Sequence, residues 1–323
     1  MIRMFWTMAA LVGLLVSVAS APAQQRFPAK PVRLLIPYAA GGAVDILGRT
    51  LGDELSKKWG QPVVIENRTG AGGTIASQVV AKSEPDGYTL VIIASGHAIN
   101  PYLYKQLPYD TFKDFTPISL LGSSPNMLLV AANSRFKTLA DVLAEARAKP
   151  GSLSYGMSGI GTSTHLAGEL LKYMAKVHIT AVSYKGGAPQ INDLLGGHIP
   201  LSFNNIPESI GQIRAGSLRV LGVTSAKRAA VLPDRPTIAE GGVPGYDTGV
   251  WWGLLGPGGM PLDLAAKISK DCAEALHTPA VKQRLDNLGA AVLGTTGPEF
   301  DKFIRDEYQK WGPIIKAAGI KGS

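Results

Sequence analysis

The sequence of 323 residues has one cysteine, only 17% charged residues and no block of five or more like charges. The single cysteine, Cys272, excludes an internal disulfide and a cysteine-rich zinc site, and its place in an amphipathic segment predicts a buried, unreactive thiol. The formal net charge is +8, but no basic run is interleaved with aromatic residues, so we expect no nucleic-acid partner. The hydrophobic content of 46% excludes a disordered chain.

The first 23 residues have the pattern of a secretory signal peptide. Arg3 precedes an apolar run from Phe5 to Val18, and the segment ends in Ala21-Pro22-Ala23, which is an A-x-A cleavage site. The apolar run is shorter than the roughly 20 residues that a membrane-spanning helix needs, so a retained anchor is the weaker interpretation. We expect residues 1–23 to be removed and the exported chain, starting at Gln24, to be soluble.

Strand-like and helix-like segments alternate along the rest of the chain. Short apolar runs predict strands at residues 32–37, 62–66, 88–94, 153–157, 178–182, 199–203 and 218–223. Apolar residues at helical spacing predict helices at residues 44–55, 74–82, 139–148 (with Thr138 as its N-cap), 165–175, 189–195 and 209–214, and in the tail around 300–311. This alternation is typical of an α/β fold with parallel sheets covered by helices on both faces.

Four loops after predicted strands are rich in glycine, serine, threonine and asparagine. They are residues 37–42, 95–100, 158–163 and 184–187. Ligands of open α/β sheets bind outside the carboxyl ends of the strands. All but 95–100 run directly into a helix, where free N–H groups and the helix dipole favour an anion. The loops predict a site for a small anion, although ordinary strand-to-helix turns also need glycine.

Single side chains near these loops have two interpretations each. Asp45 either caps its turn or holds an amine or hydroxyl of a ligand. Lys185 either pairs with a ligand carboxylate or is an exposed loop residue. His97 and Asn100 either donate hydrogen bonds to a ligand or stabilise their own loop.

Enzyme motifs are incomplete in this sequence. A nucleophile elbow, G-x-S-x-G, fails because Ile160 stands at its last position. The sequence has no Gly-Lys pair and therefore no phosphate-binding Walker loop, and Gly159-Ile160-Gly161 lacks the third glycine of a dinucleotide-binding turn. We therefore expect no cofactor.

Two enzyme hypotheses stay open on the residues alone. His165 and Glu169 lie four apart on one predicted helix and could offer two metal ligands, although a local contact between them is the simpler interpretation and we expect no metal. Ser158 could also combine with His97 or His165 in a secreted hydrolase, because such residues assemble in space rather than in sequence.

Several strings in the chain resemble those of the Bug family, the substrate-binding proteins of tripartite tricarboxylate transporters. They are residues 37–45, 66–73, 86–90, 107–110, 161–169, 184–189 and 232–237, in the order of the family. The resemblance runs from about Pro31 to the tail. It implies a two-lobed periplasmic binding protein (type II-like), each lobe a mainly parallel sheet flanked by helices, which captures a dicarboxylate, tricarboxylate or aromatic acid for uptake or sensing.

The resemblance also implies a division of the chain and a set of partners. Domain one would comprise residues 24–123 and 225–323, and domain two residues 124–224, with the ligand between them. We expect a monomer that is not an enzyme, with membrane permease subunits as its partners.

In the family, loops matching 38–42 and 158–163 hold ligand carboxylates, and loops matching 95–100 and 184–187 line the cleft. The residues that we expect to bind the ligand are Tyr38, Ala39, Ala40, Gly41, Gly42, Asp45, Ser95, His97, Asn100, Ser158, Gly159, Gly161, Thr162, Ser163, His165, Tyr184, Lys185, Gly186 and Asn204.

The chain departs from the family pattern in two places. Ala39-Ala40 replaces the usual pair of prolines before the two glycines. Asn204-Asn205 stands where many relatives carry Asp before Asn. The missing acid disfavours a ligand with an ammonium group and favours a simple dicarboxylate or aromatic acid.

Overall fold

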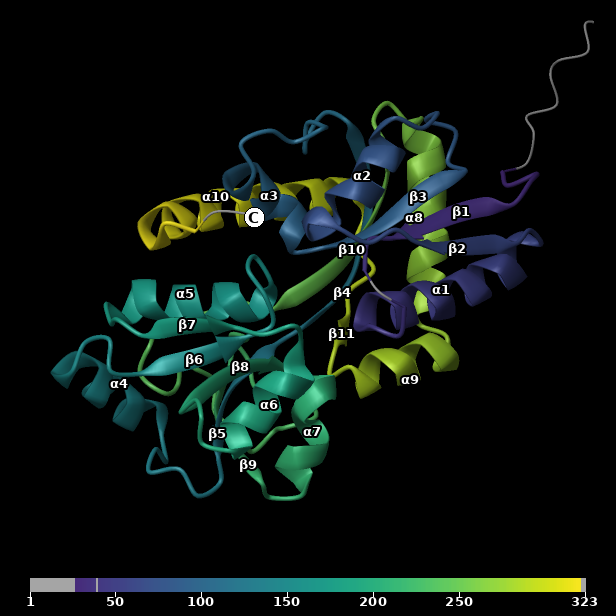
Figure 1. The fold of residues 1–323 in the computed structure, drawn as a ribbon. Coiled ribbons are helices and arrows are strands. Elements are labelled where there is room, and N and C mark those ends of the chain that lie inside the picture. The colour runs from purple at the N-terminus through teal and green to yellow at the C-terminus, as the bar shows by residue number, and fades with distance from the viewer. Residues whose placement is uncertain (1–26, 39, 321–323) are drawn as a thin grey trace, which may run out of the picture.

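The structure is a computed structural model that describes residues 27–38 and 40–320. The predicted signal peptide (residues 1–23) and Ala39 lie outside the described residues. The described residues form two sheets, each with helices packed on it (Figure 1). Within these ranges no helix combines the length and apolar composition needed to cross a membrane.

The first lobe contains a six-stranded sheet in the order β11-β4-β10-β3-β1-β2. Its strands are β1 (Val32–Ile36), β2 (Val63–Asn67), β3 (Thr89–Ala94), β4 (Phe115–Ser124), β10 (Val250–Pro257) and β11 (Ala291–Val292). Its helical segments are α1 (Ala43–Trp59), η1 (Ala71–Gly73), α2 (Thr74–Ala81), α3 (Gly96–Leu103), α8 (Leu262–Leu276) and α9 (Pro279–Asn287).

The second lobe contains a five-stranded sheet in the order β7-β6-β8-β5-β9. Its strands are β5 (Asn126–Ala131), β6 (Ser154–Met157), β7 (Thr180–Ser183), β8 (Leu201–Asn205) and β9 (Leu218–Val223). Its helices are α4 (Leu139–Ala148), α5 (Ser163–Ala175), α6 (Gly187–Leu195) and α7 (Ile206–Arg214).

The two-lobed α/β fold is confirmed, but both sheets are mixed rather than mainly parallel. Strand β1 is parallel to β2 and β3, and β6 is parallel to β7 and β8. In contrast, β10 is antiparallel to β3 and β4, and β5 is antiparallel to β8 and β9. The antiparallel strands are those next to the crossings between lobes, where no helix returns the chain to the start of its sheet.

Two segments connect the lobes side by side. The chain leaves the first sheet at Ser124 and enters the second at Asn126. The Asn126 N–H donates to Thr224 Oγ1 at 2.7 Å, and the Thr248 N–H donates to the Thr224 carbonyl at 2.9 Å. After β9, Thr237 pairs with Val223, so the start of the returning segment packs on the second lobe. The predicted division into residues 24–123 with 225–323 and 124–224 stays a prediction.

One of the four predicted loops is a helix. Residues 96–103 form α3, although the sequence there suggests a loop because of Gly96 and Pro101. Ala98 and Ile99 are completely buried, and burying them on one helical face outweighs the weak helix propensity of glycine and proline.

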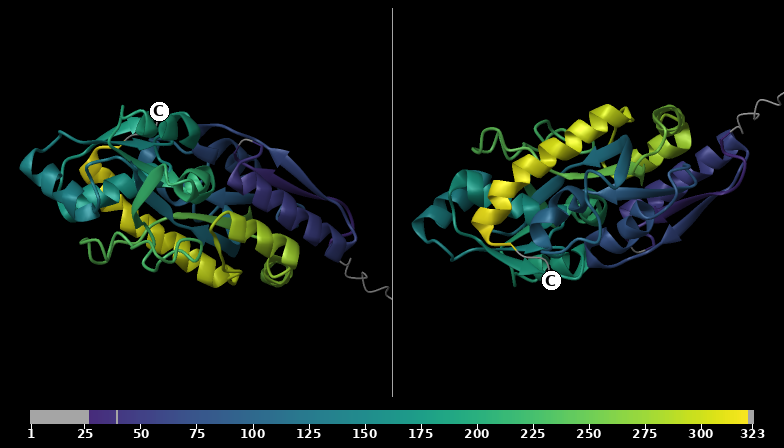
Figure 2. Two further views of the ribbon diagram at one scale, coloured as in Figure 1. Left: turned by 90° about the horizontal axis from the view of Figure 1, so that it is seen from below. Right: turned by 90° about the horizontal axis from the view of Figure 1, so that it is seen from above.

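Helix α10 (Gly297–Ala318) connects the cores of the two lobes. Near its start Phe300 and Ile304 pack against the first sheet, and near its end Trp311 and Ile315 enter the core that contains β5 and β6. Figure 2 shows α10, in yellow, running from one lobe to the other. Cys272 in α8 has no exposed surface, and burial raises the pKa of its thiol, so the prediction of a buried cysteine is confirmed.

Candidate functional site

A cavity of about 400 Å³ lies between the lobes. It is lined by Tyr38, Gly41, Gly42, Ala43, Val44, Ile46, Gly72, Ala94, Ser95, Gly96, Asn100, Leu103, Tyr104, Ser124, Ile160, Gly161, Thr162, Ser163, Asn205, Pro207, Glu208, Val250, Trp252 and Leu288. Among these described residues there is no lysine or arginine, and Glu208 carries the sole carboxylate. The starts of four helices, α1, α3, α5 and α7, border the cavity.

The loop between β1 and α1 is held in shape by Asp45, which is buried behind it. Asp45 Oδ2 accepts from the Gly41 N–H at 2.9 Å and from Arg49 Nε at 3.0 Å, and Oδ1 accepts from Asn67 Nδ2 at 2.8 Å. Burial acts to raise the pKa of Asp45, but these hydrogen bonds outweigh it and lower the pKa below its ordinary value. Asp45 therefore caps the turn and does not line the cavity.

The free donors of this loop belong to its backbone. Gly41 has φ +83°, which lets the chain turn into α1 after Tyr38. The N–H groups of Gly42, Ala43 and Val44 have no acceptor among the described residues. All three residues line the cavity, so these N–H groups and the α1 dipole favour an anion there.

The loop between β6 and α5 supplies the opposite wall. Gly159 and Gly161 have φ +114° and +77°, and Thr162 is the N-cap of α5, with its Oγ1 accepting from the His165 N–H. The Gly161 N–H does not face a ligand, because it donates to His165 Nδ1 at 3.1 Å. Gly161 therefore shapes the wall, whereas Ser163, which also lines the cavity, has an N–H without an acceptor among the described residues.

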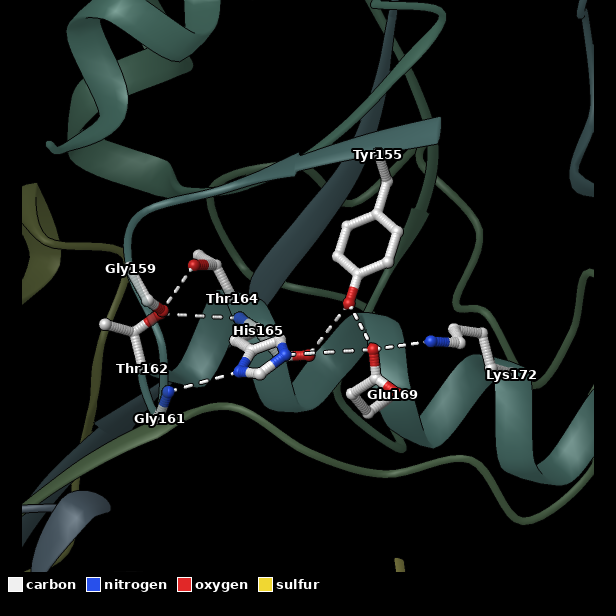
Figure 3. A network of polar contacts seen from close by, with 8 residues as sticks. All are labelled: Tyr155, Gly159, Gly161, Thr162, Thr164, His165, Glu169 and Lys172. Carbon is white, nitrogen blue, oxygen red and sulfur yellow. Dashed lines mark hydrogen bonds and ion pairs between the residues drawn. The ribbon is translucent and has the colours of Figure 1, made fainter. Parts of the chain in front are cut away.

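A buried polar network behind this loop keeps it in place (Figure 3). Glu169 Oε1 accepts from Tyr155 Oη at 2.8 Å and from Lys172 Nζ at 2.7 Å, and it lies 3.8 Å from His165 Nε2. Burial lowers the pKa of His165, which agrees with a neutral ring whose Nδ1 accepts from Gly161. Nδ1 of His165 is thus used within the protein, Nε2 faces Glu169, and the residue lies outside the cavity lining.

The hypothesis of a metal pair at His165 and Glu169 gains no support from this geometry, because the carboxylate oxygen nearest the ring already has two donors. In the described part of the chain no three His, Cys, Asp or Glu side chains are grouped as metal ligands. Ser158 Oγ donates to Gln190 Oε1 at 3.1 Å rather than to a histidine.

The predicted residues on α3 divide between the cavity and the core. Ser95 and Asn100 line the cavity, and Asn100 Nδ2 donates to the Gly72 carbonyl at 3.3 Å. His97 is only 4% exposed and packs against the rings of Tyr109 and Phe115, with centroid separations of 6.1 and 4.9 Å. Burial lowers the pKa of His97 to about 4, so its ring is neutral.

The predicted loop at 184–187 lies outside the cavity. Tyr184 Oη donates to Asp193 Oδ2 at 2.8 Å, and Lys185 is exposed. Asn204 is completely buried and its Oδ1 accepts from the Asn205 N–H at 2.8 Å. Because successive residues at a strand end point to opposite sides, Asn205 lines the cavity instead of Asn204.

The structure thus brings together eight of the predicted residues in one cavity. They are Tyr38, Gly41, Gly42, Ser95, Asn100, Gly161, Thr162 and Ser163. The other described ones, Ala40, Asp45, His97, Ser158, Gly159, His165, Tyr184, Lys185, Gly186 and Asn204, are outside its lining. Sequence reasoning missed Tyr104, Asn205, Glu208 and the apolar wall of Val250, Trp252 and Leu288.

A second cavity, of about 420 Å³, lies beside the same connecting segments. It includes charged groups of both signs, among them Lys227, Arg228 and Glu307, and none of the predicted ligand-binding residues. Arg228 already pairs with Glu240. Glu307 already accepts hydrogen bonds from Trp251 and Trp311. The cavity between the helix starts is therefore the candidate site.

The chain is similar to known proteins along most of its length. A family model described as "Tripartite tricarboxylate transporter family receptor" matches residues 47–320. Protein BugT of Bordetella pertussis is 32% identical over 317 residues, which cover 97% of each chain.

Two solved structures have the same fold along almost their whole length. The structure titled "R. palustris Rpa4515 with adipate" has 38% identity and a TM-score of 0.80, covering 91% of this chain and 99% of that one. MatC (Rpa3494) from Rhodopseudomonas palustris, with bound malate, has 32% identity and a TM-score of 0.76, covering 90% and 100%. With this agreement along the chain, in sequence and in fold, the protein belongs to the family of tripartite tricarboxylate transporter receptors.

Proposed function

We propose that the protein is a periplasmic receptor that captures a small carboxylate, namely a dicarboxylate, tricarboxylate or aromatic acid, for uptake or sensing. The observation that most supports this proposal is a cavity bordered by helix starts. It has unpaired backbone N–H groups and no lysine or arginine among its described lining residues. Backbone donors of this kind bind carboxylates without a charged side chain. The relatives crystallised with adipate and malate support the same ligand class.

Binding without turnover is the expected behaviour. Purified protein mixed with succinate, adipate, citrate or benzoate should unfold at a higher temperature with at least one of them. A ligand at about 100 times its Kd adds about 2.7 kcal/mol to the free energy of unfolding. Thermal unfolding with and without each acid measures the shift, and NMR of the mixture shows whether the acid is consumed. No shift with any carboxylate would contradict the proposal.

The competing proposal of a hydrolase or metal-dependent enzyme has less support. Ser158 and His165 each bond to other residues, Gln190 and Gly161, and the two do not bond to each other. His97 packs against the rings of Tyr109 and Phe115, and among the described residues it forms no hydrogen bond to Ser158. We therefore propose a receptor that is not an enzyme. We also propose a monomer with membrane permease subunits as its partners, which the match to a transporter receptor family supports.

We also propose that the protein is exported and loses its signal peptide. The receptor family and the A-x-A site together support cleavage after Ala23. N-terminal sequencing of the protein from a periplasmic extract should start at Gln24 or within a residue or two of it. Recovery of the protein with Met1 intact would contradict export by cleavage.

A further inference from the structure

Glu208 is an acid in a cavity that we propose for acids. It lies in the first turn of α7, and in the described part of the chain it forms no ion pair. The described lining residues of the cavity include no lysine or arginine that could neutralise this carboxylate. An anionic ligand therefore meets a like charge on this side.

The position of the Glu208 carboxylate is fixed by its contacts. Oε1 accepts from Asn205 Nδ2 at 3.3 Å. On the other side the carboxylate rests on the backbone of Gly187, because a Cβ built there would be only 1.8 Å from Oε2. Glycine at 187 leaves the room that the carboxylate fills, so Glu208, although exposed as a residue, has its carboxylate at the cavity wall.

Glu208 is an exposed residue in the first turn of α7, but its carboxyl lies against the cavity wall, where partial desolvation makes its charge somewhat costly. Burial of the carboxyl raises its pKa, and the hydrogen bond from Asn205 offsets this only in part. A ligand group that donates a hydrogen bond to Glu208 would relieve that cost, whereas a second carboxylate would add to it.

We propose that Glu208 is a specificity residue, which selects carboxylates that also carry a hydroxyl or ammonium group. This inference rests on the proposed function. Residue 204 is asparagine where many relatives carry aspartate, but Glu208 provides a carboxylate at the cavity. This reverses our expectation that the chain disfavours an ammonium-bearing ligand. Backbone N–H groups of α1 and α5 bind the carboxylates of such a ligand, and the Glu208 carboxylate accepts a hydrogen bond from the ligand's hydroxyl or ammonium group.

Matched pairs of acids test the inference. Succinate is compared with malate, which adds one hydroxyl, and with aspartate, which adds one ammonium group, by calorimetric titration. Adipate is included as a further probe of carboxylate binding. A hydrogen bond to a charged acceptor corresponds to about a tenfold or greater preference, so the wild type should bind malate or aspartate at least about tenfold more tightly than succinate.

In Glu208→Gln the preference for malate or aspartate over succinate should fall to about threefold or less. Succinate should bind this variant more tightly than it binds the wild type, because the negative charge at position 208 is gone. Glu208→Ala provides a second variant that cannot accept from the ligand. Glu84→Gln, an exposed acid outside the cavity, makes the same change in net charge and should keep the wild-type preference.

The outcomes separate the two proposals. If the wild type binds adipate or succinate but the preference is absent, or is unchanged in both Glu208 variants, the role of Glu208 is overturned and the receptor stands. If the wild type binds none of the four acids but binds citrate or benzoate, the role of Glu208 is overturned and the receptor stands. If it binds none of these six acids, the carboxylate receptor fails and the inference with it.

Discussion

Replacing Gly161 by valine is expected to reduce carboxylate binding by at least about 100-fold while the protein stays folded. Gly161 has φ +77°, a conformation that a β-branched residue rarely adopts. A Cβ there would lie 2.8 Å from Leu103 Cδ1 in the other lobe. Valine would therefore distort the loop, displace the start of α5 and hold the lobes apart at the cavity.

Two variants of nearby residues give the comparison. Thr162→Ala removes the N-cap of α5, which costs about 1 kcal/mol of stability, and should weaken binding only modestly. Lys185→Ala removes an exposed charge outside the cavity and should bind as the wild type does. Circular dichroism establishes that each variant is folded before calorimetric titration. Loss of binding in Lys185→Ala with binding retained in Gly161→Val would mean that a side-chain charge holds the ligand.

Replacing His97 by phenylalanine is expected to stabilise the protein most strongly in mild acid. The ring nitrogens of His97 are buried and form no hydrogen bond of good geometry in the described ranges. Burial lowers the pKa of the ring to about 4, and a backbone contact with Thr111 offsets this only in part. An unfolded histidine has a pKa of about 6.5. Between these values the unfolded chain binds a proton that the folded protein does not, so wild-type stability falls as the pH falls, by roughly 3 kcal/mol in total.

Urea unfolding at pH 7.5, 6 and 5 measures this difference. His97→Phe should be at least as stable as the wild type at pH 7.5, and its advantage should grow toward pH 5. His198→Phe, at an exposed position, shows what the loss of a histidine does without burial. Carboxylate binding by His97→Phe should match the wild type, because His97 is outside the cavity lining. A constant difference across the pH range would contradict a neutral, buried His97.

Local sequence signals predicted the parts of the fold that depend on local interactions. Helix α4 spans Leu139–Ala148 as expected, and Thr138 forms a capping box with Asp141. Strand β9 also has the expected limits, Leu218–Val223. The glycine-rich turns before α1 and α5 were predictable for the same reason, because a chain that turns sharply into a helix needs residues that tolerate positive φ.

Long-range packing decided what the sequence did not show. Strand β4 contains Pro117, which cannot donate to a neighbouring strand, and the sheet accommodates it where the register of β4 and β10 shifts. Glu208 resembles any acid in the first turn of a helix, where a carboxylate suits the dipole. Its place in the cavity depends on how α7 faces the first lobe, which no local pattern records.

The path of α10 has a consequence for when the protein folds. Trp311 and Ile315, almost the last residues of the chain, are buried with Leu128 and Tyr155 from the middle of it. The core of the second lobe is therefore incomplete until α10, which follows every other described helix and strand, has been synthesised. Until then, the part of this core that Trp311 and Ile315 cover is exposed to solvent.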